Sequence, residues 1–367
     1  MLIRHFQVAI VLAFACLLTG HVQAVPDKVE RLKAVLPLDD AQKAMIKEYA
    51  GYWVQKLESE QPAEVQQARD KLSRPFRSVS GETASRMFRD IYSQETLPTL
   101  EKIVAGSNAY RAINAMQVAA AIGSPDSLSL LDNHIEPDVE KNPEIRLWAA
   151  IGISRCLGVD SISSDKIKTS LRALVRAAKI ETNPLVLRRE METLNMAILN
   201  TRSDSEILRD FAISSEIDVL KTTLDRVEQK NAPVSLLLAV QPSLLLIRMQ
   251  YINPTLQRLV MDNERGRQEK VATYIGRRAA PQMGRIYDVI LVNESAIREN
   301  PELAESVGQM LDTSETMLKL VDSHVRENQS APSVDSGREL WTKGNLSGLA
   351  ESRDKWQVVL TNRPYQN

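Results

Sequence analysis

The chain has 367 residues, with 46 lysines and arginines against 47 aspartates and glutamates, which gives a formal net charge of -1 at pH 7. This balance excludes the strongly basic character of proteins that bind nucleic acid by general electrostatic attraction. Aromatic residues make up only 5% and glycines number 14, while leucine, alanine and glutamate are abundant. Such a composition favours helices along almost the whole chain.

The first 24 residues have the features of a secretory signal peptide. Arg4 lies in a short polar start, residues 8–18 form an apolar run, and Val22 and Ala24 fit the positions before a cleavage site. We therefore expect export to a periplasmic or extracellular location, with cleavage after Ala24. Two alternatives are a retained membrane anchor and lipidation of Cys16, although the residues before this cysteine fit a lipidation site poorly.

Residues 25–80 are expected to form an N-terminal helical cap. Pro37 ends a short amphipathic segment, Asp39 or Asp40 can cap a helix that runs to about Ser59, and Pro62 begins the next helix. Two further helices, around residues 87–92 and over residues 97–105, are expected before the central part of the chain.

Two later segments share one frame, shifted by 35 residues. Asn142 can cap a helix whose first residue is Pro143 and whose end is followed by Gly158. In both copies a glycine follows an arginine by 12 positions, and small residues fill the middle of the helix. The matched positions are Arg111, Ala115, Val118, Ile122 and Gly123 in the first copy and Arg146, Ala150, Ile153, Leu157 and Gly158 in the second. This recurrence predicts stacked pairs of antiparallel helices.

A third, weaker copy begins at Asn183-Pro184. Arg188 lies 12 positions before Asn200, and asparagine can replace glycine in the left-handed conformation that ends many helices. Asn-Pro also occurs at Asn142, Asn253 and Asn300, and each pair suits an N-cap followed by proline in the first turn.

Residues 234–247 form the most apolar segment of the mature chain. Gln241 and Pro242 interrupt it and Arg248 follows it, which favours a buried helix over a membrane span. Helices are expected to continue over residues 253–263, 268–280, 283–297 and 303–325. Residues 328–337 are polar and predict a linker, and residues 338–367 predict a last helical segment. No stretch alternates in the way that predicts a sheet.

The frame of residues 111–123 and 146–158 resembles the HEAT and armadillo-like repeats. These families also have paired helices, small residues in mid-helix, an inner arginine and a turn with Pro or Asp, here Pro125-Asp126 and Val159-Asp160. The resemblance implies an all-α, right-handed superhelix (an α-solenoid) of antiparallel helix pairs with helical caps. It places the repeats at residues 81–232 and a helical continuation at residues 233–327. It also implies protein binding on the concave face, and it supplies no catalytic residues.

The residue types needed for catalysis are scarce. After cleavage only His134, His324 and Cys156 would remain of the histidines and cysteines. They are too few and too far apart for a zinc site or a nucleophile-histidine pair, and Cys156 is expected to be a buried, inert thiol. We find no glycine-rich phosphate loop and expect no cofactor. A hydrolase that uses only carboxylates, such as Asp39 and Asp40, stays an alternative.

A basic segment lies at residues 265–285. Its six basic residues, against Glu269, give it a net charge of +5. The candidate binding residues are Arg267, Lys270, Arg277, Arg278 and Arg285. The first four of these fall close to one helical stripe, which could bind an acidic partner, an anionic glycan or lipid headgroups. The favoured alternative is that the acidic residues 301–327 neutralise this stripe within the chain.

From the sequence, then, we predict an exported, non-catalytic scaffold that binds other proteins on the concave face of a helical array. The alternative is an envelope protein that binds a glycan or membrane surface through the basic stripe. No binding of nucleic acid is expected.

Overall fold

The computed structural model describes residues 27–77, 83–200, 205–252, 259–262, 267–326, 331–362 and 365. The predicted signal peptide and Asn253 lie outside these residues. The described part is all-α apart from one short hairpin. The chain divides into two compact units, residues 1–96 and residues 97–367.

Unit 1 contains the 3-10 helices η1 (Asp27–Leu32) and η2 (Arg74–Phe76), the helices α2 (Asp40–Lys56) and α3 (Pro62–Ser73), and the first part of α4 (Arg86–Val104). Asp39 caps α2 in a capping box with Gln42, as predicted. Two tyrosine hydroxyls hold the end of α3, because Tyr49 donates to the carbonyl of Lys71 and Tyr92 to that of Leu72. The two helices expected over residues 87–105 are one continuous helix, α4, with Pro98 inside it.

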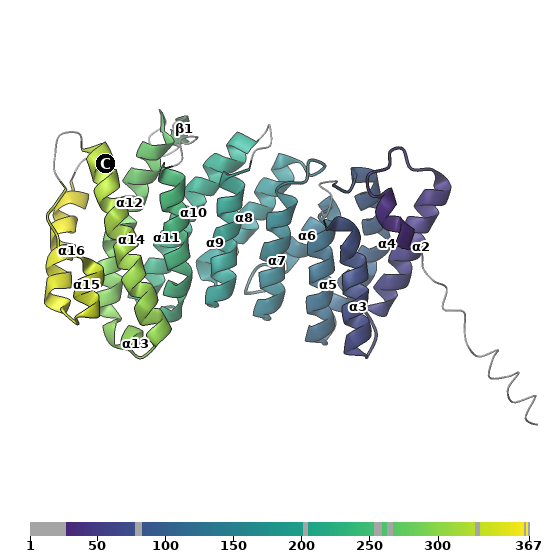
Figure 1. The fold of residues 1–367 in the computed structure, drawn as a ribbon, viewed down its shortest axis with the longest axis horizontal. Coiled ribbons are helices and arrows are strands. Elements are labelled where there is room, and N and C mark those ends of the chain that lie inside the picture. Colours follow the sequence, from purple (N-terminus) through teal and green to yellow (C-terminus); the bar gives the residue numbers. More distant parts are fainter. Residues whose placement is uncertain are drawn as a thin grey trace, which may run out of the picture. The chain divides into compact units, whose positions relative to one another are not determined.

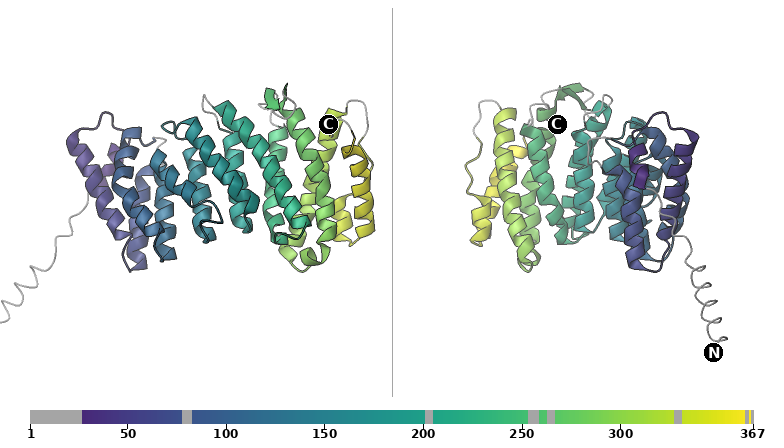
Figure 2. Two further views of the ribbon diagram at one scale, coloured as in Figure 1. Left: turned by 180° about the vertical axis from the view of Figure 1, so that it is seen from behind. Right: turned by 45° about the vertical axis from the view of Figure 1, so that its right-hand side comes forward.

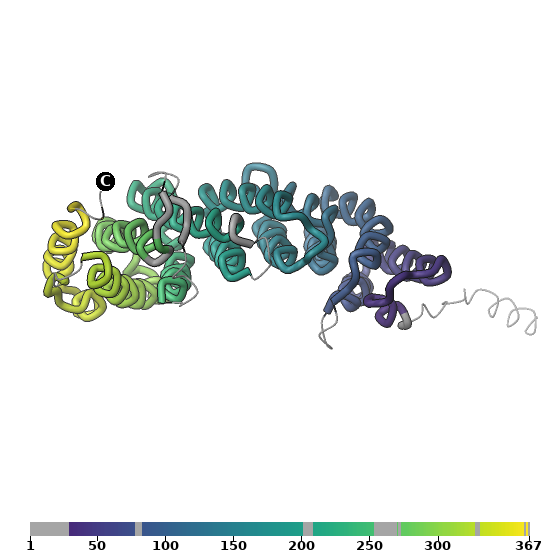
Figure 3. The backbone as a smooth tube through the Cα atoms, turned by 90° about the horizontal axis from the view of Figure 1, so that it is seen from above, coloured from purple at the N-terminus to yellow at the C-terminus, as the bar shows by residue number. Residues whose placement is uncertain are grey.

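The helices of unit 2 after α4 lie in two layers. The first layer consists of α5 (Ala109–Ile122), α7 (Pro143–Cys156), α9 (Pro184–Ile198), α11 (Leu237–Ile252) and α14 (Pro301–Val325), each in contact with the next. The second layer consists of α6 (Pro125–Asn133), α8 (Ser164–Ile180), α10 (Ser205–Glu228), α12 (Val271–Val292) and α16 (Leu346–Leu360). Three short helices, η3 (Val234–Leu236), α13 (Glu294–Arg298) and α15 (Gly337–Thr342), complete the unit. Figures 1 and 2 show these helices side by side, and Figure 3 shows the two rows.

The asparagines before proline begin their helices as predicted. Asn142 accepts a hydrogen bond from the backbone N–H of Glu144, Asn183 from that of Leu185, and Asn300 from that of Leu303. Proline follows in the first turn of α7, α9 and α14, where its missing N–H leaves no backbone hydrogen bond unmade.

The helix ends agree with the prediction in part, since a glycine follows α5 and α7 as expected but Asn200 does not adopt the left-handed conformation. Gly123 closes α5 in the left-handed conformation, with φ of 58°. Gly158 and Asn200 have no positive φ, since the only described residues that do are Gly123, Lys230 and Gly344. The side-chain amide of Asn200 instead donates to the carbonyl of Leu157 at 2.7 Å. Its side chain therefore caps the end of α7, the preceding helix of the layer.

The inner arginine of the second copy forms a buried ion pair. The guanidinium of Arg146 donates to both carboxylate oxygens of Glu181, at 2.7 and 2.8 Å, and to the carbonyl of Glu140. Glu181 also accepts from the backbone N–H groups of Thr182 and Asn183. The pair thus joins α7 to the start of α9, across 35 positions of sequence.

Small residues allow the first two copies to pack closely. A Cβ atom added to Gly152 on α7 would lie 2.5 Å from a methyl carbon of Leu131 on α6 and 3.0 Å from Cβ of Ala120 on α5. The prediction that another helix lies against the middle of this one is therefore confirmed. Cys156 is buried at the end of the same helix, as expected.

Residues predicted as helix include a hairpin. Strand β1 (Leu259–Asp262) pairs antiparallel with β2 (Arg267–Lys270), and α12 begins only at Val271. The intervening sequence contains Asn263 and Gly266, residue types common in tight turns. Each strand has four residues, which is too short for a recognisable alternating pattern.

The apolar segment expected to be a buried helix forms η3 and α11. By length and composition, Val234–Ile252 is the one helical segment among the described residues that could cross a membrane, and half of its most apolar window is buried within the protein. Leu237, Val240 and Leu244 are buried, whereas Leu245, Met249 and Ile252 are exposed. The helix is therefore buried on one side only.

The last helices pack against the end of the two layers. The indole N–H of Trp341 on α15 donates to the carbonyl of Ala304 on α14, and the guanidinium of Arg298 lies 4.1 Å from the centre of its ring. The carboxylate of Glu315 accepts from Tyr287 and from the backbone of Gly337. Residues 331–336, in the predicted linker, form no regular element before α15.

We expect Arg146→Ala to lower the free energy of unfolding by about 3–5 kcal/mol, because it leaves the carboxylate of Glu181 buried without its ion-pair partner. Denaturant unfolding followed by circular dichroism measures the change. The matched control is Arg176→Ala, whose bond to Glu136 is also short (2.7 Å) but whose side chain is 65% exposed against 6% for Arg146. This control should cost at most about 1 kcal/mol, and equal losses would show that burial does not decide the cost.

We expect Gly152→Ala to cost about 1–3 kcal/mol, since its methyl group would overlap the side chain of Leu131. Gly158→Ala is the control, because a Cβ there has no neighbour within 4 Å and the change should be neutral or stabilise by up to about 1 kcal/mol. Thermal unfolding compares the two variants. A Gly152→Ala protein as stable as wild type would contradict the close packing of α7.

Candidate functional site

The five basic residues predicted to bind an anionic partner do not share a helix. Arg267 and Lys270 belong to β2, and Arg277, Arg278 and Arg285 lie on α12. The predicted single helical stripe is therefore wrong. Lys270 is exposed, whereas Arg277 is only 6% exposed.

Acids of α10 form ion pairs with two of the arginines of α12. Arg285 forms ion pairs with Asp225 and Glu228. Burial opposes its charge, but these two carboxylates outweigh the burial and raise the pKa of Arg285. Arg278 lies 3.8 Å from Asp218 and stacks on Tyr274, 5.3 Å from the ring centre. The acids in these ion pairs lie on α10, whereas the sequence suggested acids of residues 301–327.

Charged residues of α10 also link three helices of the second layer. Asp218 on α10 lies 3.9 Å from Lys179 on α8 and 3.8 Å from Arg278 on α12. The guanidinium of Arg226 on α10 donates to three carbonyls at the end of α8, those of Lys179, Ile180 and Glu181. The exposed side of this layer is therefore a network of charges that hold its own helices together.

The residues weighed for catalysis have local structural contacts. Nδ1 of His134 lies 3.0 Å from a carboxylate oxygen of Glu140, and Nδ1 of His324 lies 3.2 Å from the carbonyl of Leu320. Asp39 caps α2, and Asp40 pairs with Lys43 at the surface. Within the described residues no group of three or more His, Cys, Asp and Glu could hold a metal ion.

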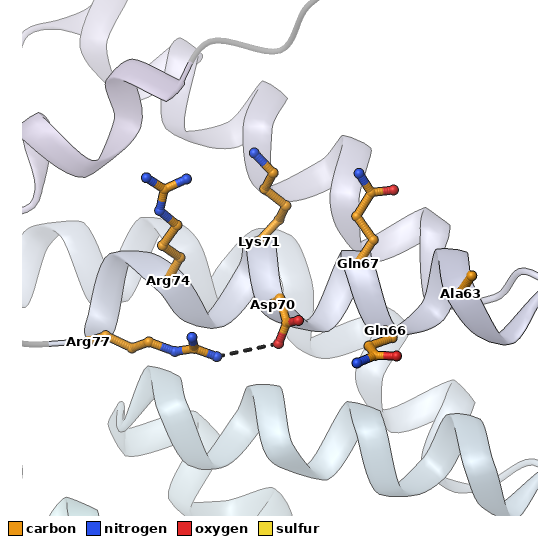
Figure 4. A pocket seen from close by; sticks show the side chains of 7 residues that line it. All are labelled: Ala63, Gln66, Gln67, Asp70, Lys71, Arg74 and Arg77. Atoms are coloured by element: carbon orange, nitrogen blue, oxygen red, sulfur yellow. Dashed lines mark hydrogen bonds and ion pairs between the residues drawn. The ribbon is translucent and has the colours of Figure 1, made fainter.

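A pocket of about 450 Å³ lies along α3 and η2 in unit 1. Figure 4 shows Gln67, Lys71 and Arg74 on one side of it, while Arg77 reaches Asp70 at 3.4 Å. Arg74 also pairs with Glu30 at 2.6 Å. The pocket brings together amides and paired charges, without facing acids or a nucleophile beside a base, so its lining does not suggest a catalytic site.

A different surface, on the first layer, is unusually apolar. We call it the apolar surface and define it by the exposed or half-buried residues Trp148 and Ile151 of α7, Leu185, Met196 and Leu199 at α9, and Leu245, Met249 and Ile252 of α11. Leu185 is 65% exposed and Met249 is 63% exposed. Large apolar side chains that gather at one place on a surface are typical of binding sites.

Helical spacing places these residues on one side of each helix. Along α9 the exposed apolar positions are 185, 196 and 199, and along α11 they are 245, 249 and 252, separations that return to the same face of a helix. The opposite faces of α7, α9 and α11 are buried. Because α7 contacts α9 and α9 contacts α11 (Figure 1), the three apolar stripes lie side by side on the outer side of the layer.

The charges beside the apolar surface are mainly positive. The helices α7, α9 and α11 expose or half-expose four arginines and two glutamates; these are Arg155, Arg188, Arg189, Arg248, Glu144 and Glu192. Arg188 and Arg189 share Glu192, at 2.9 and 3.1 Å. Arg248 has no ion-pair partner among the described residues. Four positive charges against two leave a net charge of +2.

Buried polar contacts also involve the three helices that carry the apolar surface. The hydroxyl of Thr193 on α9 lies 2.9 Å from the carbonyl of Arg189 on its own helix and 3.2 Å from that of Ala150 on α7, so the two carbonyls share its one proton. The amide of Gln250 on α11 donates to the carboxylate of Glu216 on α10 at 2.8 Å. Burial raises the pKa of Glu216 to about 8, although the hydrogen bond from Gln250 opposes this. These contacts join α9 to α7 and α11 to the second layer.

Sequence reasoning missed the apolar surface. Residues 234–247 were expected to be buried as a whole. The sequence of α9 was identified only as a weak third copy of the repeated frame. The available signal was the number of leucines and methionines on α9 and α11, which exceeds what one buried face of each helix needs.

Comparison with known proteins leaves the family open. No protein-family model matches the chain, and no curated protein matches it. Among solved structures, the crystal structure of an engineered protein aligns with a TM-score of 0.28 at 11% identity, covering 73% of this chain and 97% of the other. Similarity at this level supports no conclusion about fold or function.

We expect the protein to lose stability as the pH rises from about 4.5 to about 8, because folded Glu216 keeps a proton that the unfolded chain releases. The loss from this group would be up to about 5 kcal/mol. Glu216→Gln keeps the hydrogen bond from Gln250 and should flatten the dependence, as measured by denaturant unfolding at several pH values. The exposed Glu305→Gln is the control, and an unchanged slope in Glu216→Gln would refute the assignment.

Proposed function

We propose that this protein is a non-catalytic scaffold that binds another protein on the apolar surface of α7, α9 and α11. The observation that carries the proposal is the exposure of leucine, isoleucine and methionine side chains on three neighbouring helices. Exposing such side chains to water costs free energy, and a partner that covers them recovers it. Met196 and Met249 add flexible side chains that adapt to a partner's shape.

The contrast between the two layers supports this choice. On the second layer, Asp218, Asp225 and Glu228 pair with cations of the adjacent helices. These cations and acids are therefore already paired within the chain. On the first layer, Met249 and Leu185 protrude and Arg248 has no described ion-pair partner. A partner on the first layer would therefore displace few existing interactions.

We further propose that the layers of unit 2 form a right-handed α-solenoid related to HEAT or armadillo-like repeats, with the first layer on its concave face. The shared frame, the 35-residue spacing of Arg146 and Glu181 and the two layers are the supporting observations. Export to the periplasm or outside the cell also belongs to this proposal, on the basis of the apolar run and Ala24 in the first 24 residues.

The alternative, an envelope protein that binds an anionic glycan or membrane surface through the basic residues, has less support. Arg278 and Arg285 are paired with α10, and Arg277 is buried. Among the candidates whose side chains the structure describes, Lys270 is the exposed cation that would remain for such a partner. Salt-sensitive binding to glycans or anionic vesicles that Lys270→Glu abolishes would favour this alternative.

To test the proposed function, the purified protein is immobilised and proteins of its own envelope fraction are captured and identified by mass. We expect Leu185→Glu with Met249→Glu to lose at least one protein that wild type retains, while unfolding stays within about 0.5 kcal/mol of wild type because both residues are exposed. The control, Ile180→Glu with Val358→Glu, places the same charges on exposed apolar positions of α8 and α16 and should retain it. Identical captured sets for all three proteins would overturn the proposal.

A further inference from the structure

The chemistry of the apolar surface restricts the partner that it fits, and this inference rests on the proposed function. Neighbouring helices of a layer pack about 8–10 Å apart, and a helix with its side chains is about 10–12 Å wide. A partner helix can therefore lie along two neighbouring helices at once. The exposed apolar side chains of α9 and α11, Met196, Leu199, Leu245 and Met249, suit one apolar stripe of such an added helix.

The charges on α9 and α11 favour particular residues on either side of the partner's apolar stripe. Arg188 and Arg189 lie on α9, Arg248 lies on α11, and Glu192 is the acid that Arg188 and Arg189 share. A partner with glutamate or aspartate flanking its apolar stripe would neutralise this excess, whereas lysine or arginine flanks would add repulsion. We infer that the apolar surface binds an amphipathic helix of another protein, with an apolar stripe between acidic flanks.

The remainder of the first layer argues against two other occupants. The next helix of the layer, α14, exposes three acids, Glu302, Glu305 and Asp312, against one cation, Lys319. An anionic bilayer that also covered α14 would meet this acidic excess, while a single helix along α9 and α11 avoids it. A second copy related by a two-fold axis would place the arginines of each surface opposite each other, which is unfavourable without a neutralising ion.

The test uses two synthetic helical peptides of about 18 residues, or five turns. They share one leucine stripe and differ only in their flanks, glutamate in one and lysine in the other. Fluorescence anisotropy with the purified protein measures both affinities. We expect the glutamate peptide to bind at least about tenfold more tightly, a difference of about 1.4 kcal/mol, and this preference to shrink as ionic strength rises.

Charge reversal supplies the matched variants. Arg188→Glu with Arg248→Glu should remove or invert the preference, because it replaces two positive charges on α9 and α11 by negative ones. The control, Lys168→Glu with Arg172→Glu on α8 of the second layer, reverses as many charges and should keep it. Leu185→Glu with Met249→Glu should weaken both peptides alike.

The outcomes separate this inference from the proposed function. Equal affinity for both peptides, lost in Leu185→Glu with Met249→Glu, would overturn the acidic flanks and leave the binding scaffold standing. Binding to anionic vesicles but to neither peptide, or self-association that the same double variant abolishes, would overturn the helical partner. If no peptide binds and the captured proteins are the same for every variant, both proposals fail.

Discussion

The buried ion pair between Arg146 and Glu181 is the contact on which the order of the first layer depends. Both side chains are almost fully removed from water, so each charge is tolerable only while the other is in place. Glu181 also accepts hydrogen bonds from the backbone before α9, so the pair fixes where that helix begins. A displacement of α9 along α7 by even one turn would leave two buried charges apart. We infer that this cost selects one register among the many that apolar packing would allow.

Other polar contacts follow the same pattern, in which a residue from a later part of the chain caps the end of an earlier helix. The amide of Asn200 caps Leu157, and the guanidinium of Arg226 closes the last carbonyls of α8. Each of these caps forms only when the neighbouring helix is in position. The capped carbonyls therefore have these hydrogen bonds only when the helices are packed together. This is how a protein built from local contacts obtains cooperative folding.

What the sequence could predict was local chemistry. Asn142 and Asn183 were identified as N-caps because a cap requires only the residues within one turn of it. The hairpin at Leu259–Asp262 was missed because four residues per strand leave no readable pattern, and the ion-pair partners of Arg285 were misplaced because they depend on which helix lies beside α12. The apolar surface was missed because the sequence does not say which face of α11 the neighbouring helices leave uncovered.

The two layers differ in the side chains that they expose: the second layer carries paired charges and the first carries apolar side chains. Mutual neutralisation on the second layer stabilises the stack and leaves its charges committed to adjacent helices, as Asp218 shows by lying near cations of both α8 and α12. In the first layer, Thr193 contacts the neighbouring α7 and Gln250 binds Glu216 of the second layer, while the opposite sides of α9 and α11 expose apolar side chains. A binding surface carried by packed helices loses less conformational entropy on binding than a segment that must first become ordered. That combination, rather than any single residue, is why we place recognition on α7, α9 and α11.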